Sequence, residues 1–124
     1  SSVDYIIDPL RYDPKSDTSK AGVRLLLLGA IGSSSNTDGS DAWKNTDNTD
    51  FVAGANDIIE YDGSNWHVVF DASEEYLTYN EETVTTVYTT NLNTGVQYYW
   101  DGEQWLLSVD GEYAKGDWTI KLDG

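Results

Sequence analysis

The sequence predicts an all-β fold: a small, largely antiparallel β-sandwich or a partly open barrel of about seven or eight strands. The chain is rich in Thr, Val, Tyr and Trp, which fit the pleated, half-buried surface of a sheet. No long window places apolar residues at helical spacing. Asp-Gly dipeptides lie between alternating runs, a pattern typical of β-hairpins. A single domain is expected over residues 1–124, because this length is near the modal size of one domain.

The first half of the chain contains two candidate strands and a long loop. Residues 3–8 can form a short strand, and Pro9 ends it because proline has no N–H for the ladder. Residues 23–31 are the most apolar stretch and lack alternation. They predict a strand covered on both faces, with a buried helical turn as the alternative. Residues 32–50 contain one large apolar side chain, Trp43, and are predicted to be a long flexible surface loop.

Hairpins dominate the second half. Residues 83–90 form a run of β-branched residues and predict a strand. Residues 74–82 are ambiguous and could form a helical turn that the hydroxyl of Ser73 caps, with glutamates in its first turn. Three hairpins are expected, at residues 57–71, 96–110 and 111–122.

One corner occurs twice, as YDGSNW at residues 61–66 and as WDGEQW at residues 100–105. Aspartate can bond its own downstream backbone, and glycine tolerates a positive φ because it has no Cβ. Turn chemistry therefore accounts for the Asp-Gly pairs without a catalytic role. The predicted structural turn residues are Asp62, Gly63 and Trp66 in the first corner, and Asp101 and Gly102 in the second.

The length of each corner predicts which aromatic side chains face one another. A four-residue loop places Tyr61 opposite Trp66 and Trp100 opposite Trp105, where facing aromatics fix the register. Core packing is the first interpretation of these rings, since large aromatics dominate core energetics. The alternative is an aromatic platform for a sugar ring or a partner's side chain. The candidate binding residues under that alternative are Trp43, Tyr98, Trp100 and Trp105.

The charge and the composition of the chain limit the classes of partner and the kinds of site that it can have. The net charge is −15 and the seven Lys and Arg residues form no cluster, so neither nucleic acid nor an anionic membrane is expected as a partner. Without Cys, disulfides and thiolate metal sites are excluded. The longest apolar run is far shorter than a membrane span. The chain also lacks Met, so we expect a fragment of a longer protein.

The sequence offers no constellation typical of an enzyme, and no cofactor is expected. The only histidine, His67, lies in a predicted strand opposite Glu60, where a cross-strand pair is the simpler interpretation. Nothing singles out a pair of acids for glycan cleavage. A calcium site in the long loop is a weak alternative to a solvated loop, because its spacing does not match the EF-hand. Its candidate ligands are Asp38, Asp41, Asp47 and Asp50.

The corner pattern, Tyr or Trp followed by Asp-Gly-x-Asn/Gln-Trp, resembles a recurring hairpin of bacteriophage virion proteins. The run from DAWKN through ANDIIEYDGSNWHVVFDASE to TNLNTGVQYYWDGEQW resembles an accessory β-domain of structural proteins in contractile-tailed, T-even-type phages. Tail sheath, neck and baseplate components are the relevant classes, and the resemblance covers residues 41–118. It implies a non-enzymatic virion component, assembled in the host cytoplasm, with other virion proteins or copies of itself as partners.

Three functions therefore stand as hypotheses. The first is a non-enzymatic structural or interaction domain of a phage particle. The second is a carbohydrate- or receptor-binding β-module that uses Trp and Tyr as stacking surfaces. The third is a glycan-cleaving enzyme with a carboxylate pair.

Overall fold

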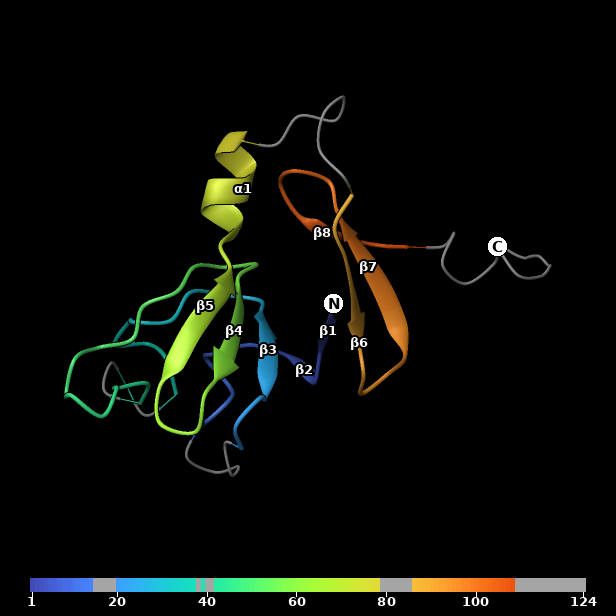
Figure 1. The fold of residues 1–124 in the computed structure, drawn as a ribbon. Helices are drawn as coiled ribbons and strands as arrows, with labels where there is room; N and C mark the ends of the chain where they lie inside the picture. The colour runs from blue at the N-terminus through green and yellow to red at the C-terminus, as the bar shows by residue number, and fades with distance from the viewer. Residues whose placement is uncertain (15–19, 38, 40–41, 79–85, 109–124) are drawn as a thin grey trace.

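The computed structural model describes residues 1–14, 20–37, 39, 42–78 and 86–108. Within these ranges the chain forms eight strands in two four-stranded sheets, with one short helix (Figure 1). This confirms the predicted all-β class, as an open sandwich and not a closed barrel. The elements are β1 (Ser2–Val3), β2 (Tyr5–Ile7), β3 (Arg24–Leu27), β4 (Ile58–Tyr61), β5 (Trp66–Phe70), α1 (Ala72–Thr78), β6 (Tyr88–Asn91), β7 (Val96–Trp100) and β8 (Trp105–Leu107).

The two sheets are named here by the half of the chain that supplies most of their strands. The N-sheet has the strand order β2-β3-β4-β5, and the C-sheet has the order β1-β6-β7-β8. Among the strand pairs of the described residues, only β1–β6 and β2–β3 are parallel, so this part of the fold is largely antiparallel, as predicted. Both Asp-Gly hairpins lie within one sheet each: β4–β5 in the N-sheet and β7–β8 in the C-sheet.

The prediction of a single strand over residues 3–8 is wrong, because the chain changes sheet at Asp4. β1 pairs with β6 of the C-sheet, whereas β2 pairs with β3 of the N-sheet. The backbone N–H of Asp4 donates to the carbonyl oxygen of Arg24 (2.8 Å), and its carboxylate accepts the N–H of Arg24 (2.9 Å). These two bonds fix the bend, and strands that switch sheets commonly make the corners of such sandwiches.

The strand β3 is covered on both faces, as its apolar sequence predicts. Leu25 and Leu27 point into one cluster of buried residues, whereas Leu26 belongs to a different cluster on the opposite face. This division follows from the period-two alternation of a strand. The alternative of a helical turn is wrong for Arg24–Leu27.

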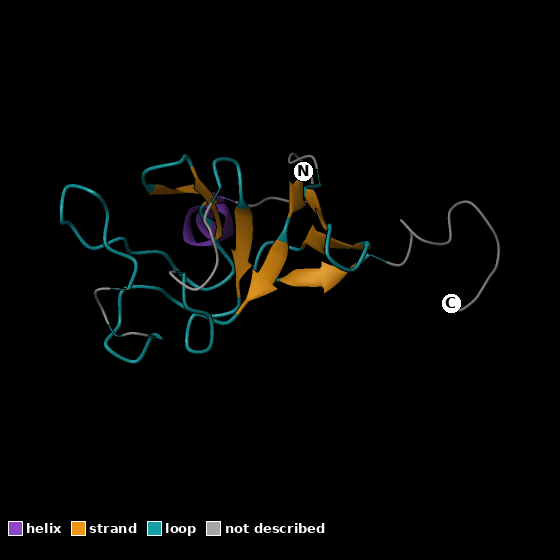
Figure 2. Ribbon diagram, turned by 90° about the horizontal axis from the view of Figure 1, so that it is seen from below, coloured by secondary structure: helices purple, strands orange, loops and turns teal. Residues whose placement is uncertain are grey.

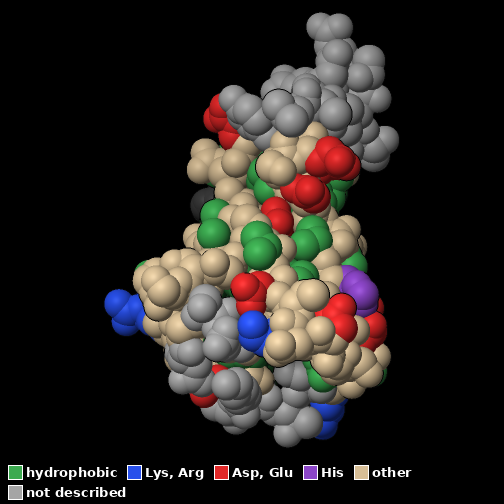
Figure 3. Space-filling model, turned by 90° about the vertical axis from the view of Figure 1, so that its left-hand side faces the viewer, with side chains coloured by type: hydrophobic (Ala, Val, Ile, Leu, Met, Phe, Trp, Pro, Cys, Tyr) green, Lys and Arg blue, Asp and Glu red, His purple; other side chains and the backbone are tan. Residues whose placement is uncertain are grey.

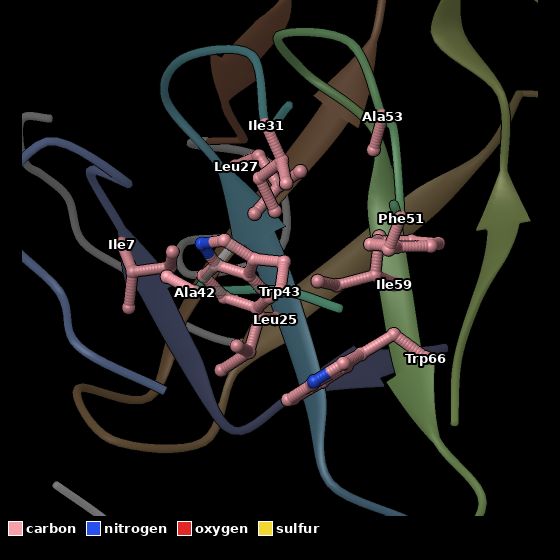
Figure 4. Packing of buried hydrophobic residues seen from close by; sticks show 10 residues of the cluster. All are labelled: Ile7, Leu25, Leu27, Ile31, Ala42, Trp43, Phe51, Ala53, Ile59 and Trp66. Atoms are coloured by element: carbon pink, nitrogen blue, oxygen red, sulfur yellow. The ribbon is translucent and has the colours of Figure 1, made fainter. Parts of the chain in front are cut away.

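Two hydrophobic cores result, one on each face of the N-sheet. The core between the sheets contains Val3, Leu26 and Ile58, with Phe70 and Trp105 packed against it. The other core lies between the N-sheet and the long loop, whose turns lie to one side of the strands in Figure 2. The buried members of this loop-side core are Ile7, Leu25, Leu27, Ile31, Ala42, Trp43, Phe51, Ala53, Ile59 and Trp66 (Figure 4).

The long loop covers the N-sheet through Trp43, whose side chain is only 1% exposed. Its ring lies 5.3 Å from the ring of Trp66 and 6.1 Å from that of Tyr12. Asn36 shapes the start of the loop: its amide oxygen accepts the N–H of Gly32 (2.9 Å), and its amide nitrogen donates to the carbonyl of Ala30 (3.1 Å). The described part of the loop is thus a layer of the fold. Its flexibility stays a prediction, which amide exchange would test.

The helix begins at Ala72, so the prediction that Ser73 caps it is wrong. Asp71 is the capping residue: its Oδ1 accepts the backbone N–H groups of Ser73 (3.1 Å) and Glu74 (3.3 Å). These bonds, and one from the hydroxyl of Ser73 (2.7 Å), lower the pKa of Asp71. Either residue type can cap a helix, and the end of β5 at Phe70 places Asp71 at the cap.

Some predicted elements extend beyond the described residues. β6 begins at Tyr88. Residues 83–85 of the strand predicted at residues 83–90 lie outside the residues that the structure describes. The third hairpin, predicted at residues 111–122, lies wholly outside it.

Candidate functional site

Both Asp-Gly corners have the predicted four-residue loop. Tyr61 pairs directly with Trp66, and Trp100 pairs with Trp105. The backbone N–H of Asp62 donates to the carbonyl of Asn65 (3.0 Å), which closes the first loop. Asp101 closes the second loop in the same way, onto Gln104 (3.1 Å).

The aspartate and glycine of each corner play the turn roles expected of them. Oδ1 of Asp62 accepts the N–H groups of Ser64 and Asn65, both at 2.7 Å. Oδ1 of Asp101 accepts the corresponding pair of N–H groups, both at 2.8 Å. Gly63 and Gly102 have φ values of 103° and 105°, which side chains with a Cβ rarely adopt. Local backbone bonding therefore occupies one oxygen of each corner aspartate.

The two corners bury their tryptophans on opposite faces of the N-sheet. In the loop-side core the ring of Trp66 lies 5.0 Å from that of Tyr61 and also contacts Trp43. Between the sheets, Phe70 lies 5.2 Å from Trp100 and 4.9 Å from Trp105. One corner thus closes each hydrophobic core, and edge-to-face ring pairs of this kind stabilise packing beyond their buried area.

The stacking role predicted for Trp43 and Trp100 gains no support from their positions, because each side chain is only 1% exposed and offers no ring face to a ligand in this conformation. Trp105 is partly buried, and its indole Nε1 donates to the carbonyl of Asn56 (2.9 Å). Tyr98 is partly exposed, and strand alternation places it on the same face of the C-sheet as Trp100, toward the core between the sheets. The predicted residues do not form one open platform.

An open pocket of about 420 Å³ lies where the turn before β4, the start of α1 and the second corner meet. Its most buried acid is Asp57, which is 4% exposed. Oδ2 of Asp57 accepts the N–H of Gly54, and Oδ1 accepts the N–H of Ala72, both at 2.8 Å. Burial raises the pKa of Asp57, although these two bonds oppose the shift. The lining residues are Gly54, Ala55, Asn56, Asp57, Ala72, Ser73, Trp100 and Glu103.

Asp57 is therefore a clamp between the turn and the helix. Both of its oxygens already accept backbone N–H groups, so it is poorly placed to exchange a proton with a ligand. The other acid of the pocket, Glu103, is exposed at the second corner. The carboxyl groups of Asp57 and Glu103 differ in burial. No contact among the described residues holds the two groups on opposite sides of a position that a substrate could occupy.

The described residues contain no group of three or more side chains suited to hold a metal ion. Asp47 bonds to the N–H of Thr49 (3.1 Å) and to its hydroxyl (2.5 Å), and these bonds lower the pKa of Asp47. Asp50 forms an ion pair with Lys44 (2.9 Å). The other two candidate calcium ligands, Asp38 and Asp41, lie outside the described residues.

The outer face of the C-sheet carries a feature that the sequence interpretation missed. Tyr88 of β6 pairs with Tyr99 of β7, which in turn pairs with Leu106 of β8. Beside this row, Thr90 pairs with Gln97. Period-two alternation was the available signal, since it places Tyr99 on the face opposite its two neighbours.

The C-sheet face differs in charge from the surface beside β5. Figure 3 shows the other side of the molecule, which is the left-hand side in Figure 1. There hydrophobic side chains gather in the middle of the face, with acidic side chains above and below them. Val68 and Val69 of β5 are exposed, and the neighbouring His67 contacts Asp62. None of the C-sheet strand residues, in contrast, has a charged side chain.

Comparisons with known protein families, with curated proteins and with solved structures give no match for this chain. No relative therefore assigns a role to any residue of these surfaces, and the resemblance to phage virion proteins stays a hypothesis. Within the described residues, no helix combines the length and the apolar character needed to cross a bilayer.

Asp62 is expected to make stability depend on pH in the acid range. The N–H of Asn65, the ring of His67 at 2.6 Å and the N–H of Ser64 together lower the pKa of Asp62 to about 2. Because the folded pKa lies below the model-compound value of 3.8, the stabilisation is complete above that value. It is lost as the pH falls from 3.8 toward 2. Urea unfolding between pH 2 and 6 should show this loss.

The variant Asp62→Asn is the matched comparison, because its amide oxygen can still accept the N–H groups of the turn. We expect this variant to have a flatter stability profile than the wild type between pH 4 and 2. Two parallel profiles would show that the charge of Asp62 does not stabilise the corner.

Proposed function

We propose that this chain is a non-enzymatic structural or interaction domain of a bacteriophage particle. The motif behind the resemblance is the repeated corner, and the observation that carries the proposal is how that corner is built. In each copy the aspartate bonds its own loop and at least one tryptophan closes a core. The motif therefore stabilises the hairpin turns and the cores of a β-domain, which is the structural role that a virion component requires.

The bonding of two acids, Asp57 in the pocket and Asp62 in the first corner, also supports a role without catalysis. A carboxyl group that acts as a general acid or base needs an oxygen within hydrogen-bond reach of the substrate. Asp57 has both oxygens bonded to backbone N–H groups, and Asp62 is bonded to its own turn and to His67. The third hypothesis, glycan cleavage by a carboxylate pair, finds no support in this arrangement.

The expected partners are other virion proteins or further copies of this chain, and the expected location is the virion. With a net charge of −15 the surface repels phosphate backbones and anionic lipids, so neither is proposed as a partner. Acidic proteins can instead be steered toward basic partner surfaces.

The position of the coding sequence tests the proposal first. We expect it within, or beside, genes for tail, neck or capsid proteins. Mass spectrometry of purified particles should then detect peptides of this chain. A coding sequence with no virion genes around it, or its absence from purified particles, would overturn the proposal. Release of reducing sugar from any polysaccharide would overturn the non-enzymatic part.

A further inference from the structure

We infer that the outer face of the C-sheet is a binding surface for a neutral glycan chain. This inference does not depend on whether the chain belongs to a virion. The surface consists of Tyr88, Thr90, Gln97, Tyr99 and Leu106, which lie on three adjacent strands.

The arrangement of the aromatic rings is the first support. Tyr88 and Tyr99 are direct cross-strand partners, and Leu106 continues the same row onto β8. Neighbouring strands are about 4.8 Å apart, so the row places two flat tyrosine rings and one apolar leucine side chain at intervals comparable to the width of a sugar ring. Tyr88 is 44% exposed and Tyr99 is partly exposed, so both can contact a ligand without leaving the fold. Such a row can pack against the C–H faces of successive sugars.

The charge of the surface selects a neutral ligand. The chain has 22 acidic residues, yet no residue in the strands of the C-sheet has a charged side chain. This face offers no negative charge to attract a cationic partner and no basic group to bind an anionic one, and the net charge of −15 repels anionic polymers. Binding of a neutral polysaccharide to this face buries no charged side chain and meets no electrostatic repulsion.

The polar groups beside the row complete the site. Thr90 and Gln97 are cross-strand partners on the same face as the tyrosines. Among the described contacts, no hydrogen bond engages the side chains of Thr90, Gln97, Tyr88 or Tyr99. Hydroxyl and amide groups both donate and accept hydrogen bonds, as sugar hydroxyls require. Convergent polar groups beside aromatic rings are typical of ligand surfaces.

The test uses the full chain in affinity gel electrophoresis with three neutral polymers, xyloglucan, galactomannan and dextran, and with anionic polygalacturonate. We expect at least one neutral polymer to retard the protein and polygalacturonate not to. Replacing Tyr99 with alanine should weaken the retardation about tenfold, by analogy with other aromatic stacking platforms. Tyr5→Ala is the matched control: Tyr5 is 41% exposed, but lies on β2 of the N-sheet. This control should bind like the wild type.

A second variant separates loss of binding from loss of folding. Gln97→Glu adds a charge at a partly exposed position of the face, on β7, without removing a ring, and circular dichroism should show an unchanged fold. We expect this variant to bind the neutral polymer more weakly.

Three results would overturn the inference. The first is no retardation by any of the neutral polymers, and the second is retardation that survives both Tyr99→Ala and Gln97→Glu. The third is a dimer in light scattering that Gln97→Glu dissociates, because the face would then be an interface between copies of the chain. None of these results bears on the position of the gene, so the proposed virion role stands or falls separately.

Discussion

Replacing Trp43 with alanine is expected to lower the free energy of unfolding by about 3–5 kcal/mol. The side chain is 1% exposed and packs between Trp66 and Tyr12 in the loop-side core. Its removal leaves a cavity that neighbouring small side chains of the core, such as Ala42 and Ala53, are too short to fill. It also detaches the long loop from the N-sheet. Urea unfolding of the wild type and the variant measures the difference.

A control close to the long loop, at Val52, distinguishes the loss of a buried side chain from a general effect of substitution in this part of the chain. Val52 is 65% exposed, so Val52→Ala should change the free energy of unfolding by less than about 0.5 kcal/mol. A loss of under about 1 kcal/mol for Trp43→Ala would contradict the packing seen here. It would mean that the loop does not cover the N-sheet in solution, and would support the flexible loop that the sequence predicts. Amide exchange of residues 42–50 gives an independent measure of the same contact.

The features that the sequence predicts well are those that depend on near neighbours. The Asp-Gly corners determine both the turn and the facing pairs Tyr61–Trp66 and Trp100–Trp105, because loop length fixes register within a hairpin. The coverage of Leu26 on one face and Leu25 on the other follows from alternation within β3. In these cases the information lies within a few residues of the structure that it determines.

The missed features depend on segments that are distant in the sequence. The switch between sheets at Asp4 depends on its bonds to Arg24, which no pattern within residues 3–8 can show. The burial of Trp43 depends on Trp66 in the first corner. The outer position of Tyr99 follows from alternation only once the position of Trp100 inside the core is known. Long-range packing, and not local propensity, therefore determines which of the predicted binding residues are exposed enough to contact a ligand.

Replacing Asp57 with alanine is expected to lower the free energy of unfolding by about 2–3 kcal/mol. The carboxylate accepts the N–H of Ala72 at the buried start of α1 and the N–H of Gly54 in the preceding turn. Ala72 is buried, so its N–H would lose its partner and gain no water in exchange. Gly54 is exposed, and water can replace the lost bond there at a smaller cost. Thermal or urea unfolding at pH 7 measures the sum of the two effects.

Two further variants show whether the loss of stability in Asp57→Ala comes from the two backbone hydrogen bonds or from the charge of the carboxylate. Asp57→Asn keeps one acceptor, which can still bond the N–H of Ala72, so its loss at pH 7 should be about 1 kcal/mol. Glu103→Gln changes the exposed acid of the same pocket and should have almost no effect on stability. Equal losses for the Ala and Asn variants would contradict the clamp, because they would show that neither backbone bond needs the remaining oxygen.

The pH dependence of Asp57 should have the opposite sign to that of Asp62. Burial raises the folded pKa of Asp57 above 3.8, so the folded protein holds this proton more tightly than the unfolded chain. The contribution of Asp57 to stability is therefore largest below pH 3.8 and decreases as the pH rises through the folded pKa. The difference in stability between the wild type and Asp57→Asn should consequently grow as the pH falls toward 4, whereas that between the wild type and Asp62→Asn should shrink from about pH 4 toward 2. Opposite slopes from two aspartates of one acidic domain would show that local bonding and burial, and not the net charge of −15, determine its response to acid.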